Sequence, residues 1–232
     1  MLTEPLYLQD PYIKEFDAAV VDTGDHGVYL DKSSFYPGGG GQPCDTGWIL
    51  GDKKYRVVGM ERDMLHIIEG EKPKIGTRVR GFIDWERRYR IMRLHTALHV
   101  ISGVTYRRYG RDIITGNQIY EDKARLDLSL ENLTRELVED IIEESNRVIE
   151  KGYEVRWYYI SREEFEKRPE LMRVDPRLYD RYERIRVVEI VGFDIQADGG
   201  THVRNLREVG KIRIGKYKSK GKNKKRIYIT LV

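Results

Sequence analysis

Three of the five histidines of this chain fall in two short segments whose spacing could hold a metal ion. His95 and His99 are four residues apart in a helix-like segment, so their side chains would share one face of the helix. Two imidazoles so placed can bind one ion at Zn–N distances of roughly 2.0–2.1 Å. Alone, such a pair is more often packed in a core or exposed to water. The HExxH pattern of zinc proteases is absent, because no Glu follows His95.

The second segment contains Asp198 and His202, also four residues apart. Gly199 and Gly200 lie between them and disfavour a helix, so we expect a loop that could bring both side chains toward the first pair. The chain has a single cysteine, and any metal site must therefore rely on histidines and carboxylates. The two segments together make a stronger metal hypothesis than either one alone.

A glycine-rich segment, FYPGGGGQPCDTG, occupies residues 35–47. Four consecutive glycines let the backbone approach a ligand closely and adopt positive φ angles. The segment lacks the Lys-Ser/Thr of a phosphate-binding P-loop and also the dinucleotide-binding fingerprint. The residues alone are compatible with a flexible turn between strands and with a ligand-binding loop.

The C-terminal part of the chain is basic, although the net charge is only +4. No acidic residue follows Glu208, whereas basic side chains occur at Lys211, Arg213, Lys216, Lys218, Lys220, Lys222, Lys224, Lys225 and Arg226. Such a block is typical of a phosphate-binding surface, and it also fits a solvated basic hairpin. The apolar run 227–232 follows, so we expect the lysines on a loop between two strands. A second set of basic residues could also contact phosphates, or could form the solvated face of a helix: Arg87, Arg88, Arg90 and Arg93.

The 232 residues, 40% of them hydrophobic, suffice for one large domain or two modest ones. The first part is β-rich, and a helix with apolar spacings of three and four follows, ended by Gly110. Expected strands are 18–21, 27–30, 48–50, 55–60, 64–68 and 78–83, then 153–160, 185–190, 208–214 and 227–232. Expected helices are 85–109 and 134–151, the second beginning near Ser129 or Asn132.

The mixed order of helices and strands predicts an α+β fold. We expect a small β-barrel-like domain over residues 1–87, followed over residues 88–232 by an α+β domain that carries the metal site. Neither a signal peptide nor an apolar run long enough for a membrane span is visible. We therefore expect a cytoplasmic protein that does not bind a membrane, and no protein partner is evident.

Five segments, taken in order, resemble the editing domain of alanyl-tRNA synthetase and its free-standing relatives, the AlaX proteins. They are FYPGGGGQPCDTG, ERRYRIMRLHTALHV, KARLDLS, DGGTHVRNLREVGKIRI and KSKGKNKKRIYI. Each segment alone is ambiguous, but the ordered set is specific and covers most of the chain. The glycine-rich part ahead of the editing domain resembles the medium-length AlaX class.

The resemblance implies an aminoacyl-tRNA deacylase, which hydrolyses the ester that joins serine or glycine to alanine tRNA. It implies a Zn²⁺ site at His95, His99 and His202, with Asp198 where the family usually has Cys. Asp198 either ligates through oxygen or leaves that position to water. The metal either lowers the pKa of its bound water towards ~7 or holds the substrate's amino group, and the sequence leaves both open.

The resemblance also implies binding residues for both parts of the substrate. The amino acid pocket would be lined by Gly39, Gly40, Gln42, Thr115 and Gln118. Thr115 or Gln118 could accept or donate a hydrogen bond to a seryl hydroxyl and so favour serine over alanine. The tRNA would be bound through Lys216, Lys218, Lys220, Lys222, Lys224, Lys225 and Arg226.

Three other functions are compatible with parts of the sequence. One is an RNA-binding module with a structural metal and no hydrolysis, which a closed site with four protein ligands would favour. Another is an editing enzyme for threonine tRNA, although the FYPGGGGQP segment resembles the alanine branch more closely. The third is a hydrolase of small esters, against which the lysine block argues.

Overall fold

The computed structural model describes residues 3–171, 173, 179–180 and 182–232. The chain divides into two compact units, a barrel unit up to Ile91 and a second unit from Met92 to the end. Among the residues described, no helix is long and apolar enough to cross a membrane.

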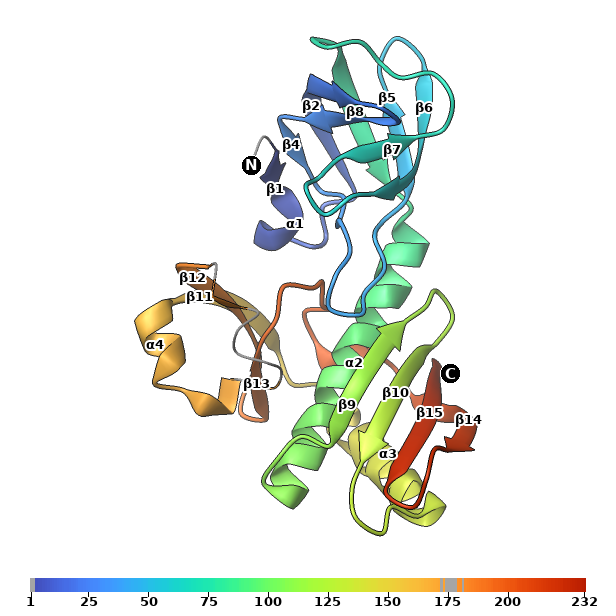
Figure 1. Ribbon diagram of the computed structural model, residues 1–232, viewed down its shortest axis with the longest axis vertical. Helices are drawn as coiled ribbons and strands as arrows, with labels where there is room; N and C mark the ends of the chain where they lie inside the picture. Colours follow the sequence, from blue (N-terminus) through green and yellow to red (C-terminus); the bar gives the residue numbers. More distant parts are fainter. Residues whose placement is uncertain (1–2, 172, 174–178, 181) are drawn as a thin grey trace. The chain divides into compact units, whose positions relative to one another are not determined.

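Six antiparallel strands of the barrel unit close into a barrel in the order β2-β3-β7-β6-β5-β8 (Figure 1). Their bounds are β2 (Glu15–Gly24), β3 (Gly27–Leu30), β5 (Gly47–Leu50), β6 (Lys54–Met60), β7 (His66–Ile68) and β8 (Arg78–Ile83). The short elements β1 (Glu4–Pro5), α1 (Leu6–Gln9) and β4 (Lys32–Ser33) precede or separate them. The predicted barrel is confirmed, and its core forms because buried and exposed residues alternate along strands such as β8.

The glycine-rich segment of the barrel unit is a tight turn. Gly39 and Gln42 exchange backbone hydrogen bonds of 3.0 and 2.8 Å. The φ angles of the four glycines, Gly38 to Gly41, are +88°, +136°, +58° and +84°, a region that residues with a Cβ rarely adopt. The run of glycines is therefore required by the backbone path of the turn.

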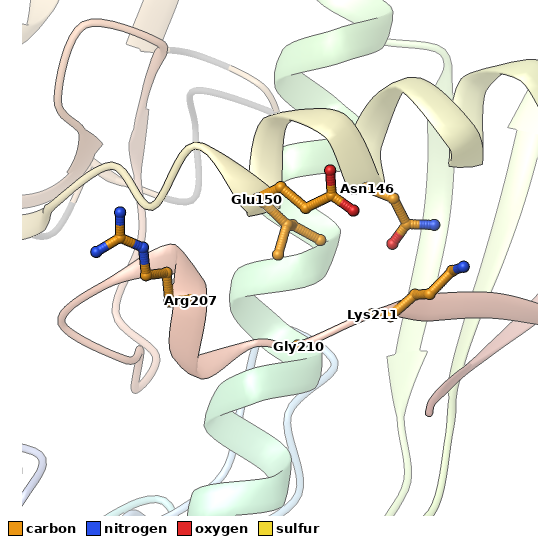
Figure 2. A pocket seen from close by; sticks show the side chains of 6 residues that line it. Asn146, Glu150, Arg207, Gly210 and Lys211 are labelled. Atoms are coloured by element: carbon orange, nitrogen blue, oxygen red, sulfur yellow. The ribbon is translucent and has the colours of Figure 1, made fainter.

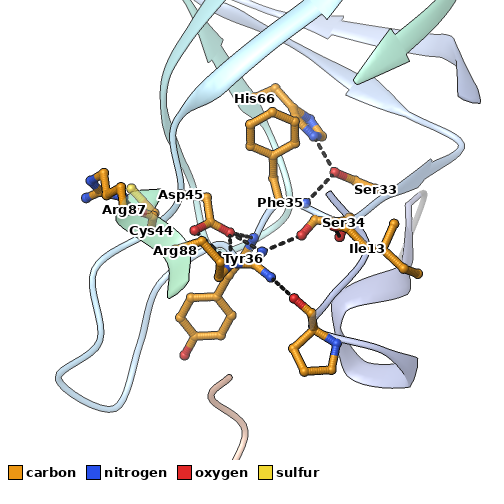
Figure 3. A network of polar contacts seen from close by, with 11 residues as sticks. Ile13, Ser33, Ser34, Phe35, Tyr36, Cys44, Asp45, His66, Arg87 and Arg88 are labelled. Carbon is orange, nitrogen blue, oxygen red and sulfur yellow. Dashed lines mark hydrogen bonds and ion pairs between the residues drawn. The ribbon is translucent and has the colours of Figure 1, made fainter. Parts of the chain in front are cut away.

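Arg88, on the first turns of the helix α2 (Trp85–Tyr109), is fully buried, so its interpretation as part of a solvated helix face is wrong. Figure 3 shows its guanidinium against the carboxylate of Asp45, and the two form an ion pair. Nε lies 2.9 and 2.8 Å from the two carboxylate oxygens, and Nη1 donates to the carbonyl of Pro11 at 2.9 Å. The partner lies far away in sequence, which is why the helix pattern did not predict it.

The second unit contains two sheets and the rest of α2 (Figure 1). The four-stranded sheet, in the order β14-β15-β10-β9, consists of β9 (Ile114–Ile119), β10 (Ala124–Ser129), β14 (Ile212–Ser219) and β15 (Lys224–Leu231). The three-stranded sheet consists of β11 (Val155–Ser161), β12 (Arg184–Ile190) and β13 (Asp194–Ala197). The helices are α3 (Arg135–Glu150) and α4 (Arg162–Glu166), with 3₁₀ turns η1 (Pro169–Leu171) and η3 (Leu206–Glu208). The predicted α+β class is confirmed.

Several element bounds differ from the predicted ones. Strands β9, β10 and β13 were not predicted. Helix α3 begins after Thr134, whose side chain accepts a hydrogen bond from the Leu137 N–H, so neither Ser129 nor Asn132 is its N-cap. The expected strand 208–214 starts only at Ile212, because residues 206–208 form a 3₁₀ turn.

Asn146 of α3 connects the helix to the edge strand β14. Its amide donates to the Ile212 carbonyl at 2.9 Å and accepts from the Ile212 N–H at 2.9 Å. Ile212 is buried, so Asn146→Leu would leave both backbone groups without these partners. We expect the free energy of unfolding to fall by about 1–3 kcal/mol. Urea unfolding followed by circular dichroism measures this change. Glu143→Gln, at an exposed position of the same helix, is the control. Equal changes in both variants would mean that the Asn146 hydrogen bonds do not stabilise the fold.

Candidate metal centre

His95 and His99 lie one turn apart on α2, as their spacing predicts, and both are buried. Ser102 and Tyr106 continue the same face of the helix at spacings of three and four. This face approaches β13 closely at Gly103, where an added Cβ would lie only 2.9 Å from the Cβ of Asp194. The missing side chain at Gly103 allows the loop after β13 to reach the two histidines.

Asp198 and His202 come from that loop. The Asp198 Oδ2 accepts a hydrogen bond from the Gly200 N–H at 2.6 Å and lies 3.0 Å from His202 Nε2. Nη1 of Arg186 donates to the carbonyls of Asp198 and Gly200 at 3.0 and 2.9 Å. These bonds fold the Asp-Gly-Gly segment so that both side chains turn toward α2.

The four residues His95, His99, Asp198 and His202 form one group, called the metal cluster below, whose donor atoms lie within 4.8 Å of one another. His95 Nε2 and Asp198 Oδ1 are 3.7 Å apart, and the ring centroids of His95 and His202 are 4.3 Å apart. Ligand atoms around a tetrahedral zinc ion are about 3.3–3.4 Å apart. Small side-chain movements would therefore bring the four donors to one ion.

The protonation states fit a metal ligand set. Burial lowers the pKa of His95 to about 3 and the pKa of His99 well below its usual value. Burial also lowers the pKa of His202. Burial opposes ionisation of Asp198, but the neighbouring imidazoles and the His202 hydrogen bond lower its pKa well below the usual value. At neutral pH the cluster thus offers neutral imidazoles and a carboxylate, the forms that bind metal.

Two further observations bear on whether the cluster fits an ion. The Nδ1 atom of His99 is buried and has no hydrogen-bond partner among the residues that the structure describes, a state that costs about 1–3 kcal/mol. A ligand bound at this Nδ1 atom would remove the cost. Thr96 Oγ1 accepts from the Val203 N–H and lies 3.2 Å from His202 Nδ1, so it can orient that ring as outer-shell partners of metal ligands do. The cluster fits a metal ion.

The residues predicted for the amino acid pocket lie in both units. Gly39, Gly40 and Gln42 form the glycine-rich turn of the barrel unit. Thr115 lies on β9 and donates to the Asp127 carbonyl at 3.2 Å, and the part-buried Gln118 lies on the same strand. Their role in substrate binding stays a prediction.

The predicted tRNA-binding side chains lie mostly on strands rather than on a loop. Lys216 and Lys218 are on β14, Lys224, Lys225 and Arg226 are on β15, and Lys220 and Lys222 are in the turn between them. In the strand register, Lys218 of β14 lies opposite Arg226 of β15, and Arg226 lies opposite Asp127 of β10. Side chains of residues that lie opposite each other are on the same face of the sheet. The Arg226 guanidinium donates to both Asp127 oxygens at 2.6 and 2.8 Å.

Lys225 differs from the other basic residues of the hairpin because its side chain is buried. Its ammonium donates to Ser219 Oγ at 3.1 Å and to the carbonyls of Gly221 and Lys222 at 2.6 and 3.2 Å. These three bonds close the turn between β14 and β15. We therefore leave Lys225 out of the surface proposed below for tRNA.

A shallow pocket lies between the end of α3 and the segment after η3 (Figure 2). Its volume is about 280 Å³, and it is lined by Asn146, Ile149, Glu150, Arg207, Gly210 and Lys211. No residue of the metal cluster and no predicted pocket residue belongs to it. The pocket and the predicted site therefore share no residue.

Arg186, which donates to two carbonyls of the loop that carries Asp198, was not predicted from the sequence. Arg186 lies in an apolar strand, and its neighbours give no sign that it folds the Asp-Gly-Gly segment. The alternation of Asp194, Gln196 and Asp198 was a usable signal, since residues two apart on a strand point to one side.

Comparison with known proteins defines the class of protein. Residues 185–228 match the family model of the threonyl and alanyl tRNA synthetase second additional domain, and residues 8–87 match that of the class II (A) tRNA synthetases. The alanine–tRNA ligase of Ignicoccus hospitalis is 40% identical over 91% of this chain, which covers 24% of that ligase. The chain is therefore related to the part of alanyl-tRNA synthetases that contains the second additional domain.

Two relatives match over their whole length. The alanyl-tRNA editing protein AlaX-M of Saccharolobus solfataricus is 41% identical over 99% of both chains, and that of Methanosarcina barkeri is 41% identical over 100% of both. This chain belongs to the AlaX-M family of alanyl-tRNA editing proteins.

Proposed function

We propose that this protein is a metal-dependent aminoacyl-tRNA deacylase that hydrolyses alanine tRNA mischarged with serine or glycine. Full-length identity of 41% to alanyl-tRNA editing proteins carries the proposal. The buried cluster of three histidines and an aspartate supports it, because a metal ion held there could activate water or polarise an ester carbonyl at neutral pH. The RNA-binding module without hydrolysis is not favoured by these relatives.

We further propose that the metal is Zn²⁺, held by His95, His99, His202 and Asp198. Neutral imidazoles with one carboxylate are a ligand set that zinc accepts in tetrahedral sites. When bound, the ion supplies Lewis acidity to the ester. The imidazoles of His95 and His202 are 5% and 0% exposed, whereas the Asp198 side chain is 17% exposed, so substrate would approach on the carboxylate side.

In the reaction, the oxygen of a water molecule bonds to the ester carbonyl carbon, and the bond from that carbon to the ribose oxygen breaks. The ribose oxygen takes up one proton of that water, the second proton passes to solvent, and the amino acid leaves as a carboxylate. The chain's own contribution is to exclude bulk water around the buried imidazoles and to hold the Asp198 carboxylate through the Gly200 N–H.

We propose that tRNA phosphates bind the face of the four-stranded sheet that carries Lys216, Lys218 and Arg226. Each neutralised phosphate releases counterions, so removing a lysine lowers the salt dependence of binding. We expect Lys216→Ala with Lys218→Ala to reduce the slope of log K against log salt by about 0.7–0.9 for each lysine. Filter binding over a salt series measures it, and Lys54→Ala on β6 of the barrel unit is the control. An unchanged slope would place the tRNA on another surface.

The decisive assay is deacylation of alanine tRNA charged with serine, beside glycine- and alanine-charged controls. We expect release of serine or glycine while alanine stays attached, in proportion to zinc content. A zinc-loaded protein that binds the tRNA but leaves all three esters intact would instead support the RNA-binding module. Activity on mischarged threonine tRNA alone would assign the enzyme to that branch.

A further inference from the structure

The three-stranded sheet of the second unit has one covered face and one partly exposed face. Ile160 of β11 points to the covered face, where it belongs to one core with Phe165 of α4. Side chains alternate between the two faces along a strand, so Trp157 and Tyr159 of β11 point to the other face. Tyr159 is 38% exposed there, and β11 is the edge strand of the sheet. An aromatic ring is therefore accessible from solvent on this face.

Tyr159 lies in one row with a member of the metal cluster across the three strands. In the strand register, Tyr159 is opposite Arg186 of β12. The Asp198 N–H donates to the Arg186 carbonyl at 3.1 Å, so Asp198 continues the pairing of β13 with β12. Side chains that lie opposite each other are on one face of a sheet, so Tyr159 and Asp198 share this face. Because neighbouring strands are about 4.8 Å apart, the backbones of these two residues are about 10 Å apart.

Cationic side chains accompany both rings. The guanidinium carbon of Arg184 lies 5.3 Å from the centroid of the Tyr159 ring, and that of Arg186 lies 5.7 Å from the centroid of the Trp157 ring. Arg186 is buried and donates to the Asp198 carbonyl at 3.0 Å, whereas Arg184 is exposed. Proteins bind unpaired nucleotides with this combination, in which an aromatic ring stacks against the base and cationic groups attract the phosphate.

We propose that Tyr159 stacks against the base of the terminal tRNA nucleotide while the aminoacyl ester of that nucleotide lies at the metal cluster. The inference rests on the proposed function and adds a binding residue outside the metal ligands. Ester and base are attached to the same ribose, so a ring that binds the base must lie within one nucleotide of the cluster. The row from Tyr159 to Asp198 meets this requirement. The exposed Arg184 complements the negative charge of the phosphate of that nucleotide.

Binding of two small probes to the zinc-loaded protein tests the inference without any turnover. Adenosine monophosphate and ribose 5-phosphate share the sugar and the phosphate and differ in the base. Ligand-observed NMR measures the affinity of each probe and the ring-current shift of the adenine protons. We expect Tyr159→Leu to weaken binding of adenosine monophosphate by about fivefold or more, to abolish that shift, and to leave ribose 5-phosphate unaffected. Tyr159→Phe keeps the aromatic ring and should bind both probes as the native protein does.

Tyr120→Leu is the matched control, because Tyr120 is also 38% exposed but directly follows β9 of the four-stranded sheet. We expect native affinities for both probes in this control. Native affinity of Tyr159→Leu for adenosine monophosphate, equal losses for the two probes, or an equal loss in Tyr159→Phe would each overturn the inference. If Tyr159→Leu does not fold, Tyr159→Thr replaces it, because a β-branched residue suits a strand.

Deacylation kinetics give a second reading. We expect Tyr159→Leu to raise KM for seryl-tRNA by about fivefold or more while kcat and zinc content stay at the native level, because stacking binds substrate and transition state alike. If the native protein cleaves the ester and the variant has the same KM, the deacylase stands and the role of Tyr159 is wrong. If the native protein has no deacylase activity, the proposed function fails, and the probe experiment still decides whether Tyr159 binds a base.

Discussion

Replacing His95 by alanine is expected to abolish deacylation of seryl-tRNA and to leave the purified protein nearly free of zinc. His95 is buried, and its donor atom lies within 4.8 Å of the donors of His99, Asp198 and His202. Loss of an outer-shell partner alone lowers metal affinity 10–100-fold, so we expect loss of a direct ligand to cost more than about 100-fold. Elemental analysis and deacylation kinetics on one preparation measure both effects.

The control for this variant is His26→Ala. His26 is a histidine of the barrel unit, 56% exposed and paired with Glu61 at 2.7 Å. We expect zinc content and activity at the native level in this control. A His95→Ala protein that keeps both zinc and activity would show that the cluster is not the metal site of the reaction.

The largest loss of stability is expected from Arg88→Met. The guanidinium and the Asp45 carboxylate are 0% and 2% exposed, and the substitution leaves a buried carboxylate without its counter-charge. Breaking one side of such a buried pair costs about 3–5 kcal/mol. Trp48 lies in the barrel unit and reports its unfolding by fluorescence in a denaturant series.

Arg90→Met is the matched control, because Arg90 is exposed on the same helix and we expect its removal to change stability by no more than about 0.5 kcal/mol. The double variant Arg88→Met with Asp45→Leu removes both charges and should recover part of the loss. Equal stabilities of Arg88→Met and Arg90→Met would mean that the buried pair does not hold the barrel unit together.

Patterns local in sequence were the reliable part of the prediction. Helix α2 and the strands β3 and β8 have the predicted bounds, because regular spacing and glycine turns mark them. The histidine pair was visible for the same reason, since a spacing of four places both rings on one helix face. Gly199 and Gly200 predicted a loop that could bring Asp198 and His202 toward that pair, and the resemblance to a family then implied the ligand set.

What the sequence could not predict depends on contacts between distant segments. Arg88 looked like a surface charge because its partner Asp45 is 43 residues away. Lys225 could not be distinguished from its basic neighbours in the sequence, because only the strand register places its side chain on the buried side of the sheet. Strands β9 and β10 were missed because polar and charged residues break up their apolar pattern.

The donor set of the metal cluster contains nitrogen and oxygen but no sulfur. Oxidants that convert a thiolate to sulfenic or sulfinic acid therefore have no target among these ligands. The only thiol of the chain, Cys44, belongs to the barrel unit. If Asp198 is the fourth ligand, as proposed, peroxide would leave that position chemically intact where a cysteine ligand would be lost to thiol oxidation.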